Sequence, residues 1–495
     1  MTLRAVLEEM EAVAVHGDSD IEIAGIAYDS RRVRPGDLFF ALGGVRADGR
    51  AFVRQALDAG AVAAVVPATA AGVAAVGATL VEVQDPRRAL AQASLKFWGH
   101  PSRELAVVGV TGTNGKTTTT YLLHAILAHA AVPAGFAGTT GVRFAGELRP
   151  SAFTTPEAPE LYGLLREMVR RGVRVVGLEL SSHALAQHRC FGIDPDVVVF
   201  TNLSHDHLDY HGTLARYLDA KLMLFDRRND PAAVKRATAV VNADDPVFPA
   251  VRDAAAAGRL AIVTYGAASG ADIAIEAVTP RTSGLAFTLH DGARALNVTL
   301  PLLGRYNAWN AAAAYGAARA LGIAPETAAA GLARAGGVPG RLERIEAGQP
   351  FAVVVDYAHT PDALGRALDA VREHFENRVL LVFGCGGDRD HAKRPVMGRI
   401  AAEHADLAWI TNDNPRTEDP AAIAAEIAAG DVTNRLRIEL DRSAAIAAAL
   451  AAAQPGDVVL IAGKGHETTQ TMGDRVQPFD DREVARTHLT RWSAS

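Results

Sequence analysis

The sequence predicts an α/β protein of about three domains that are built on mostly parallel sheets. The chain has 495 residues, which is too long for a single hydrophobic core because domains have roughly 150 residues each. Short apolar runs alternate with helical stretches over most of its length, which is typical of parallel sheets. A glycine-rich loop follows one of these runs. Apolar residues make up 49% and charged residues 21%, which excludes extensive disorder.

The composition restricts the partners and the compartment. The chain carries 50 Lys and Arg against 56 Asp and Glu, a net charge of −6, whereas nucleic-acid and anionic-membrane binders usually have a basic excess. Only Cys190 and Cys385 are present, so neither a disulfide framework nor a cysteine-rich metal site is expected. Glu8 and Glu11 interrupt the apolar core that a secretory signal needs. We therefore expect a cytoplasmic protein that binds no nucleic acid.

One uncharged stretch, residues 59–81, is long enough to cross a bilayer. Alanine dominates it, however, Pro67 interrupts it, and Gly60, Gly72 and Gly77 are spread through it. A short strand, a turn at Pro67, a small helix and a second strand explain the composition better. We expect no membrane insertion.

Three sections follow one another along the chain. Residues 1–100 mix short β-like runs with turns, and residues 101–337 alternate apolar runs with helical stretches up to a glycine- and proline-rich linker at 336–341. Residues 338–495 read as a separate doubly wound unit, whose ligands are expected at the carboxyl ends of its strands. The apolar runs of the last two sections lie at 104–112, 174–182, 197–203, 238–245, 351–359, 378–387, 407–416 and 457–465, and an alanine-rich helix at 307–322.

The segment GVTGTNGKTTTT (109–120) is the sharpest local signal. Glycines let backbone N–H groups approach phosphate oxygens, Lys116 can reach the terminal phosphates, and Thr117 can place its hydroxyl on Mg²⁺. The helix that begins there adds its positive end. The strict pattern G-x-x-x-x-G-K-[ST] would need glycine at Val110, so the loop is a variant. It predicts nucleotide binding but does not choose between a kinase, a GTPase, a motor and a ligase; no N-K-x-D guanine motif occurs.

A histidine cluster near the middle of the chain allows a second enzymatic interpretation. The segment from His205 to His211 approaches the H-x-H-x-D-H signature of metallo-β-lactamase-like hydrolases. Tyr210 stands where the last histidine is required, and that fold carries no phosphate loop upstream. A stoichiometric dinuclear zinc site would favour the hydrolase.

From the phosphate loop onward the chain resembles the Mur ligases, the ATP-dependent amino-acid-adding enzymes of peptidoglycan synthesis. The resemblance covers essentially the whole chain, and DSRRVRPGDLFFAL (29–42) is similar to part of the family's UDP-binding domain. The motifs that carry it, in order, are GTNGKTTT (112–119), TTPE (154–157), LELSSHALAQHR (178–189), TNLSHDHLDYHG (201–212), YLDAKLMLF (217–225), NADD (242–245), GRYNAWNA (304–311), PGRLE (339–343), DYAHTPDAL (356–364), FGCGGDRD (383–390), TNDNPR (411–416) and GKGHE (463–467).

The resemblance implies a three-domain architecture and a reaction. The domains are a UDP-sugar-binding domain at 1–100, a central ATP-binding domain with a P-loop sheet at 101–337 and a Rossmann-like amino-acid-binding domain at 338–495. The substrate carboxylate attacks the γ-phosphate of ATP, and an amine then attacks the resulting acyl phosphate. In the family the DNPR motif (413–416) accompanies meso-diaminopimelate, which implies that this amino acid is added to UDP-N-acetylmuramoyl-L-alanyl-D-glutamate. Bringing two anions together requires local positive charge and Mg²⁺.

The resemblance also assigns roles to individual residues. Catalytic and metal-binding roles fall on Lys116, Thr117, Glu179, His207 and Lys221, the last as a CO₂-derived carbamate (N6-carboxylysine) that holds a second Mg²⁺. ATP-binding roles fall on Gly112, Thr113, Asn114, Gly115, Lys116, Thr117, Thr118, Asn307, Asn310, Arg341, Asp356 and His359. Roles in binding the UDP-linked dipeptide fall on Ser30, Thr154, Thr155, Ser181, Gln187 and Arg189. Roles in binding meso-diaminopimelate fall on Arg389, Asp413, Asn414, Arg416, Gly463 and Glu467.

For single residues other interpretations stay open. Glu179 could be a surface residue at a strand end, His207 a core histidine, Lys221 a surface lysine paired with Asp219, and Asn307 a helix cap. Discrimination for the distal carboxylate of meso-diaminopimelate needs a cation, and Arg416 provides a guanidinium for it, with Asp413 and Asn414 able to receive the distal ammonium.

Three other functions remain as alternatives: a lysine-adding relative, a folylpolyglutamate synthetase, and a P-loop ATPase of another class. The folylpolyglutamate synthetases lack the N-terminal section and the DNPR motif. We expect a monomer whose C-terminal unit moves as a rigid body when the ligands bind, since an acyl phosphate must be kept from water.

Overall fold

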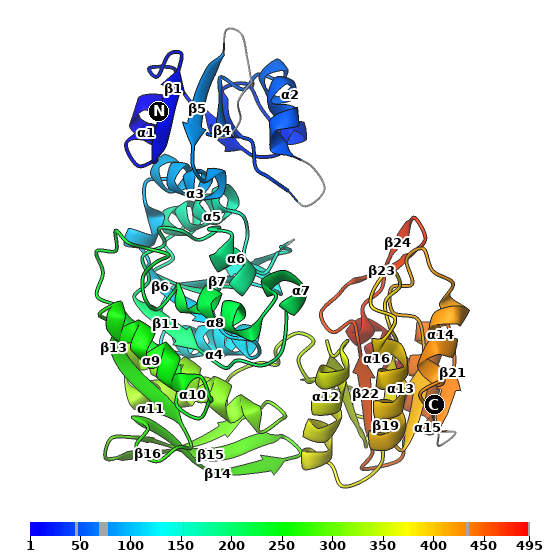
Figure 1. The fold of residues 1–495 in the computed structure, drawn as a ribbon. Helices are drawn as coiled ribbons and strands as arrows, with labels where there is room; N and C mark the ends of the chain where they lie inside the picture. Colours follow the sequence, from blue (N-terminus) through cyan, green and yellow to red (C-terminus); the bar gives the residue numbers. More distant parts are fainter. Residues whose placement is uncertain (45–47, 69–77, 152, 432–434, 494–495) are drawn as a thin grey trace. The chain divides into compact units, whose positions relative to one another are not determined.

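The structure is a computed structural model that describes residues 1–44, 48–68, 78–151, 153–431 and 435–493. By its contacts the chain forms two compact units, which are described separately below. The first unit comprises residues 1–274 with 312–328, and the second comprises residues 275–311 with 329–495. Figure 1 traces the elements in chain order.

The first unit begins with a five-stranded sheet of order β1-β5-β4-β3-β2, in which only β1 is antiparallel to its neighbour. Side chains alternate between its two faces. Leu38 and Phe40 pack in a core with helix α1, whereas Phe39 packs on the other face with helix α2. The elements are α1 (Leu3–Leu7), β1 (Ala12–His16), β2 (Gly25–Ala27), β3 (Asp37–Phe40), α2 (Val53–Asp58), β4 (Ala63–Pro67), β5 (Thr79–Val83) and α3 (Pro86–Phe97), with short 3₁₀ turns at Ser30–Arg32, Gly49–Phe52 and Pro101–Arg103.

Strands β4 and β5 occupy most of the described part of the uncharged stretch 59–81. The first strand, which ends at Pro67, and the second strand are confirmed. The expected small helix falls on residues 69–77, outside the described residues. In the part of the chain that the structure describes, every helix is too short or too polar to cross a membrane.

The first unit continues with the central parallel sheet, in the order β13-β12-β11-β6-β10-β7, followed by the antiparallel strands β8 and β9. Strand β6 lies in the middle: Val110 pairs with Glu179 of β10 on one side and with Val199 of β11 on the other. Because these strands are parallel, the residues that follow them meet at one edge of the sheet. The loop 112–115 leaves β6 at this edge.

The elements of this part are β6 (Ala106–Thr111), α4 (Lys116–His129), β7 (Ala134–Gly138), β8 (Gly141–Phe144), β9 (Glu147–Arg149), α5 (Ala158–Arg170), β10 (Val175–Glu179), α6 (Ser182–Ala186), β11 (Val197–Phe200), α7 (Leu208–His211), α8 (Leu214–Leu222), β12 (Thr238–Asn242), α9 (Phe248–Ala257), β13 (Ala261–Gly266) and β14 (Ile273–Arg281). Its core combines branched side chains of the strands with the apolar face of α5, including Leu161, Leu165 and Met168.

The second unit contains a six-stranded sheet of order β17-β18-β22-β19-β20-β21, parallel except for β17, together with most of β14 and the hairpin of β15 and β16. Its central strands β19 and β22 are buried on both faces, as the predicted continuous apolar runs require. Its elements are β15 (Gly284–Asp291), β16 (Arg294–Leu300), β17 (Glu343–Arg344), β18 (Ala352–Asp356), α12 (Pro361–His374), β19 (Val379–Phe383), α13 (Lys393–His404), β20 (Leu407–Ile410), α14 (Pro420–Ala428), β21 (Leu436–Ile438), α15 (Arg442–Ala452), β22 (Val458–Ala462), β23 (Thr469–Met472), β24 (Arg475–Pro478) and α16 (Asp481–Ser493). Helices α10 (Tyr306–Ala320) and α11 (Pro325–Ala333) are divided between the two units.

Candidate active site

The loop 112–115 is held by the residues that follow strand β11. The N–H of Thr113 donates to the carbonyl of Asn202 at 2.8 Å, and the N–H of Asn114 donates to the Asn202 side-chain oxygen at 2.9 Å. The hydroxyl of Thr201 donates to the carbonyl of Asn114 at 2.6 Å. The two strand ends therefore fix the loop in one conformation, the pre-organisation that a phosphate site needs.

Helix α4 begins directly after this loop. Gly115 precedes it with φ of 85°, a left-handed conformation that glycine adopts without strain. The Nζ of Lys116, the first residue of the helix, donates to the carbonyls of Gly112 at 2.9 Å and Thr113 at 2.8 Å. The amine therefore lies over the loop, next to the positive helix end.

Glu179, at the end of β10, is 2% exposed. Its Oε1 accepts from the N–H of Thr139, and its Oε2 accepts from the hydroxyls of Thr117 and Thr139, each at 3.0 Å. A side chain on Gly138 would lie 1.9 Å from Oε1, so only glycine leaves room for this carboxylate. Burial raises the pKa of Glu179, although Lys116 opposes that change. The Thr117 hydroxyl and this carboxylate are oxygen ligands of the kind that Mg²⁺ prefers, and a nearby cation would stabilise the charged form.

Lys221, on helix α8, is 1% exposed. Its Nζ donates to the carbonyl of Gly112 at 2.8 Å and lies 4.2 Å from the centre of the Tyr217 ring. Burial, and secondarily Lys116, lowers the pKa of Lys221 well below its ordinary value. Lys116 and Lys221 thus donate to the same carbonyl, so the structure brings these two predicted residues together.

Two of the alternative interpretations are wrong. Glu179 is buried, not a surface residue at a strand end. Lys221 is not a surface lysine paired with Asp219, because Asp219 pairs with Arg228 at 2.7 Å while Lys221 is enclosed.

His207 lies at the edge of this buried cluster, with its ring centre 6.0 Å from that of Tyr217. Its side chain is about half exposed, which excludes a core histidine, and its backbone φ is 53°. Its ring makes an edge contact with His183 at 4.7 Å, and its Nε2 lies 3.5 Å from Asp206. Burial lowers the pKa of His207 despite Asp206, which favours the neutral imidazole that binds metals.

The histidines of the hydrolase-like signature do not converge. His205 is exposed, whereas His211 is buried with its Nε2 3.0 Å from the hydroxyl of Ser182. Over the described ranges, no three His, Cys, Asp or Glu side chains gather as a metal site.

Most of the residues predicted to bind the dipeptide lie beside Glu179. The hydroxyl of Thr155 donates to the Glu179 carbonyl at 2.7 Å and accepts from the N–H of Ser181 at 3.1 Å. The guanidinium of Arg189 donates to Gln187 at 2.6 Å and to the carbonyl of Thr155 at 3.2 Å. These four residues form one connected network.

Thr154 joins the same region, because its hydroxyl lies 3.0 Å from the hydroxyl of Thr139. Ser30 does not: it lies in the N-terminal sheet region and donates to Gln55 at 3.1 Å. The structure thus brings five of the six predicted residues together.

Two predicted nucleotide-binding asparagines are adjacent in the second unit. Asn307 and Asn310 are both buried on helix α10, and the amide of Asn310 donates to Asn307 Oδ1 at 2.7 Å. The amide of Asn307 donates to the carbonyl of Leu303 at 2.6 Å. Asn307 lies inside the helix, so the interpretation as a helix cap is wrong.

The remaining predicted nucleotide-binding residues lie around strand β18: Asp356 is its last residue, His359 follows it, and Arg341 precedes strand β17. Asp356 accepts from two backbone N–H groups, at 2.7 and 2.8 Å, and burial raises its pKa although Arg341 opposes this. The guanidinium of Arg341 lies 5.1 Å from the centre of the Tyr357 ring, and the centre of the His359 ring lies 4.5 Å from that same ring centre. Arg341 and His359 therefore pack against one aromatic ring, close in sequence to a partly buried carboxylate.

The DNPR segment is rigidly held. Arg416 has φ of 53°; its N–H donates to Thr471 at 3.1 Å and its Nη1 to the carbonyl of Gly387 at 2.6 Å. Asp413 is buried, and a side chain on Gly463 would lie 2.8 Å from its carboxylate. Gly463 therefore permits Asp413 to lie against the end of strand β22. Arg416 is a non-glycine residue in the left-handed conformation, and such residues cluster at functional sites.

Asn414 is engaged by its neighbours. Its amide donates to Glu467 at 3.0 Å, and its Oδ1 accepts from the N–H of Thr471 at 3.0 Å and from Lys464 at 3.2 Å. Since a carbonyl oxygen has two lone pairs, Asn414 has little capacity left to receive a substrate ammonium. Of the other predicted residues, Asp413 and Glu467 carry carboxylates that could receive one, while Arg389 lies on the exposed loop after β19.

Three residues of these sites have no role in the sequence prediction. Thr139 donates twice to Glu179, and Lys464 contacts Asn414 and Glu467. Arg442 is completely buried against Asp481. Thr139 lies outside the quoted motifs, and nothing in the sequence brings Arg442 near the pocket. The position of Lys464 inside GKGHE was an available signal.

The central strand of the parallel sheet runs into a glycine-rich loop at the start of a helix, and the neighbouring strand carries a buried carboxylate. This arrangement defines the P-loop α/β class of nucleotide-binding proteins. Sequence models of three Mur ligase domains match the chain: the Mur ligase family catalytic domain at 22–98, the middle domain at 110–318 and the glutamate ligase domain at 340–465. The chain belongs to the Mur ligase family.

Individual relatives match over nearly the whole chain. A UDP-N-acetylmuramoyl-L-alanyl-D-glutamate–2,6-diaminopimelate ligase of Geobacillus thermodenitrificans is 44% identical over 98% of this chain and 99% of its own. The enzyme of that name from Gloeobacter violaceus is 46% identical over 95% of each chain. A solved structure bearing the same enzyme name superposes with a TM-score of 0.72, 33% identity and full coverage of both chains. The predicted fold class is thereby confirmed.

Proposed function

We propose that this protein is the ATP-dependent ligase that adds meso-diaminopimelate to UDP-N-acetylmuramoyl-L-alanyl-D-glutamate, in cytoplasmic peptidoglycan precursor synthesis. The names of relatives at 44% and 46% identity support it. The observation that carries the choice of amino acid is the DNPR segment, in which the guanidinium of Arg416 donates to the carbonyl of Gly387 and the carboxylate of Asp413 is buried beside Gly463. A zwitterionic group needs both signs of charge.

The first unit would carry out phosphoryl transfer, and the second would bind the incoming amino acid. In the first, the γ-phosphate of ATP lies over loop 112–115, where Lys116 and the start of α4 offset its charge. The substrate carboxylate attacks phosphorus, the bond to the β-phosphate oxygen breaks, and ADP leaves. The amine then attacks the acyl carbon and inorganic phosphate leaves. A Mur ligase of Thermotoga maritima, of similar fold at 21% identity and TM-score 0.60, has been solved with ADP.

Thr117 and Glu179 would hold Mg²⁺, with His207 as a further ligand. The ion would neutralise charge between the phosphate and the acceptor carboxylate. Two threonines would support these groups. Thr139 orients Glu179 through two hydrogen bonds, and Thr155 connects the residues predicted to bind the dipeptide to the end of β10.

We further propose that Lys221 is carbamylated. Its amine is enclosed and lies close to the phosphate loop. An ammonium there would repel Mg²⁺, whereas attack of the neutral amine on CO₂, with loss of a proton to water, yields an anion that can hold a second Mg²⁺. The burial that lowers the pKa of Lys221 favours the neutral, reactive amine.

The remaining assignments are part of the same proposal. The domains are 1–100 for the UDP-sugar, 101–337 for ATP and 338–495 for the amino acid, and the protein acts as a monomer. ATP and nucleotide sugars are cytoplasmic metabolites, which agrees with two free, buried cysteines.

Phosphate release tests the function. We expect release from ATP only when UDP-N-acetylmuramoyl-L-alanyl-D-glutamate and meso-diaminopimelate are both present, and Arg416→Ala should lose at least about 100-fold of kcat/KM for meso-diaminopimelate because a charged group would go unpaired. Preference for L-lysine would indicate the lysine-adding relative. Release without the UDP-sugar would indicate another class of P-loop ATPase, and unchanged kinetics of Arg416→Ala would refute the choice of amino acid.

A further inference from the structure

Lys464 lies at the centre of the polar cluster that follows strands β20 and β22. Its side chain is 0% exposed, yet it ends in an ammonium. The Nζ lies 3.2 Å from Asn414 Oδ1, 3.2 Å from Glu467 Oε2 and 3.8 Å from Asp413 Oδ1. A buried ammonium is costly unless it is paired and hydrogen-bonded. Here its partners are groups of the proposed amino-acid pocket.

This ammonium changes the charge of the pocket. Among the residues predicted to bind the amino acid, Arg389 and Arg416 carry two positive charges and Asp413 and Glu467 carry two negative charges, so these four groups sum to zero. Lys464 raises the sum to +1. The nearby cation Arg442 does not alter it, because its partner Asp481 is equally buried, 2.7 Å away.

The candidate substrates differ in the charge of their distal ends. Meso-diaminopimelate carries an ammonium and a carboxylate, with a sum of zero, whereas the single distal ammonium of L-lysine carries +1. A pocket of net positive charge repels a lone ammonium, and inside a protein this repulsion is much less screened than in water. L-2-Aminopimelate, which has the distal carboxylate alone, carries −1 and is attracted.

We propose that Lys464 is a specificity-determining residue, whose buried ammonium makes the pocket select amino acids with a distal carboxylate and reject those with a lone distal ammonium. The proposal rests on the function proposed above. Lys464 is a positioning residue: it acts through the electric field of its charge and by holding Asn414 and Glu467 in position. The group that contacts the distal carboxylate of the substrate is Arg416.

The test compares kcat/KM for meso-diaminopimelate, L-lysine and L-2-aminopimelate in the wild type and in Lys464→Gln, which keeps a hydrogen-bond donor but removes the charge. We expect the ratio of L-2-aminopimelate to L-lysine to fall at least about tenfold. Lys464→Arg, which keeps the charge, should preserve the ratio more nearly than Lys464→Gln. A merely structural role would lower all three rates alike, and a ratio within twofold of the wild type would overturn the proposal.

A charge-matched control lies at the opposite end of the same sheet. Arg378 precedes β19 and pairs with Asp457 at 2.6 Å, and Arg378→Gln should leave the ratio unchanged. If Lys464→Gln does not fold, Lys464→Met, which fills similar space without a charge, takes its place and should lower the ratio at least about tenfold; a ratio within twofold of the wild type overturns the proposal. A wild type that does not use meso-diaminopimelate at all refutes the proposed function instead.

Discussion

At the scale of single residues, Lys221 shows how burial prepares an amine for chemistry. Its Nζ donates to the carbonyl of Gly112, and both burial and Lys116 disfavour the ammonium. A carbamate removes the positive charge, which relieves the repulsion from Lys116 and supplies an anion for Mg²⁺.

Lys221→Ala should therefore lose about 100-fold or more of the ligase activity, comparable to the loss of other charge-stabilising groups. After exposure to ¹³C-bicarbonate, the wild type should show a carbamate signal by NMR that Lys221→Ala lacks. The control is Lys96→Ala, which removes a lysine paired with Glu8 on the surface at 3.0 Å and should keep both signal and activity. An active Lys221→Ala protein, or a wild type without the signal, would contradict the assignment.

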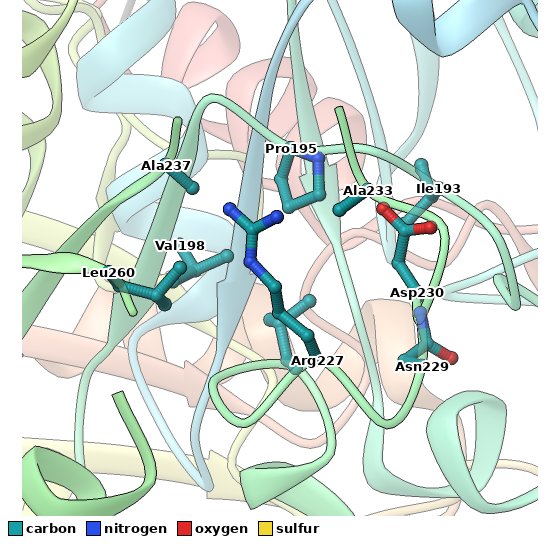
Figure 2. A pocket seen from close by; sticks show the side chains of 10 residues that line it. Ile193, Pro195, Val198, Arg227, Asn229, Asp230, Ala233, Ala237 and Leu260 are labelled. Atoms are coloured by element: carbon teal, nitrogen blue, oxygen red, sulfur yellow. The ribbon is translucent and has the colours of Figure 1, made fainter. Parts of the chain in front are cut away.

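Asp230 is a buried carboxyl with no evident part in the reaction. It faces a hollow of about 10 Å³, room for about one water molecule, and Figure 2 shows its carboxyl group and the guanidinium of Arg227 in this hollow. Within the described residues its Oδ2 has no hydrogen-bond partner. Burial and then Asp194 raise the pKa of Asp230 to about 7, although Arg227 and Arg103 oppose them.

This pKa predicts a pH dependence of stability. Asp230 has a pKa of about 4 in the unfolded chain and about 7 in the folded chain, so between these pH values it is ionised in the unfolded chain but protonated in the folded one. The free energy of unfolding therefore falls as the pH rises from about 4 to about 7 and then levels off. Asp230→Asn should remove this part of the dependence and be more stable than the wild type at pH 8 by up to a few kcal/mol. Urea unfolding at pH 5 and pH 8 measures the difference; equal slopes for both proteins would exclude the effect.

At the scale of elements, one buried ion pair ties the ends of two strands together. Arg442, at the start of α15, donates to Asp481 of α16 at 2.7 Å, to the carbonyl of Ala462 at the end of β22 at 2.9 Å and to the carbonyl of Asn412 after β20 at 3.3 Å. Both charged side chains are 0% exposed. The pair therefore fixes the two segments that carry Asp413 and Lys464.

Arg442→Met should destabilise the C-terminal sheet by about 3–5 kcal/mol, because it leaves Asp481 charged and buried. The double variant Arg442→Met, Asp481→Asn should recover part of this loss. Arg366→Met, which removes an exposed pair with Asp362, should change stability by less than about 0.5 kcal/mol. Urea unfolding followed by tryptophan fluorescence measures all three, and a loss below about 1 kcal/mol for Arg442→Met would show that the pair is not structural.

The sequence predicts elements better than it predicts their neighbours. The strands that end at Thr111, Glu179 and Asp356 and the helix that begins at Lys116 were foreseeable, because apolar runs, glycines and polar ends are local patterns. The roles of Thr139 and Arg442 were not foreseeable, because each follows from a contact with a residue 39 or 40 positions away, and for Arg442 also from full burial. The occupied carbonyl of Asn414 likewise depends on Thr471, 57 residues further on.

At the scale of the whole molecule, the residues predicted to bind ATP are divided between the two compact units. Lys116 and Thr117 belong to the first unit, and Asn307, Arg341 and Asp356 belong to the second. We predict that one ATP molecule binds to both sets of residues, in which case part of its binding free energy restricts the relative motion of the units.

We therefore expect a non-hydrolysable ATP analogue with Mg²⁺ to reduce the radius of gyration in small-angle scattering. Asp356→Asn should still bind the analogue through loop 112–115, but about tenfold more weakly, a loss of about 1.4 kcal/mol, and should show a smaller reduction at saturation because the second unit is held less firmly. The comparison separates linkage from simple binding, since both proteins are measured with the nucleotide bound. Identical scattering of the wild type with and without saturating analogue would show that the nucleotide does not couple the units, and closure would then have to come from the UDP-sugar or the amino acid.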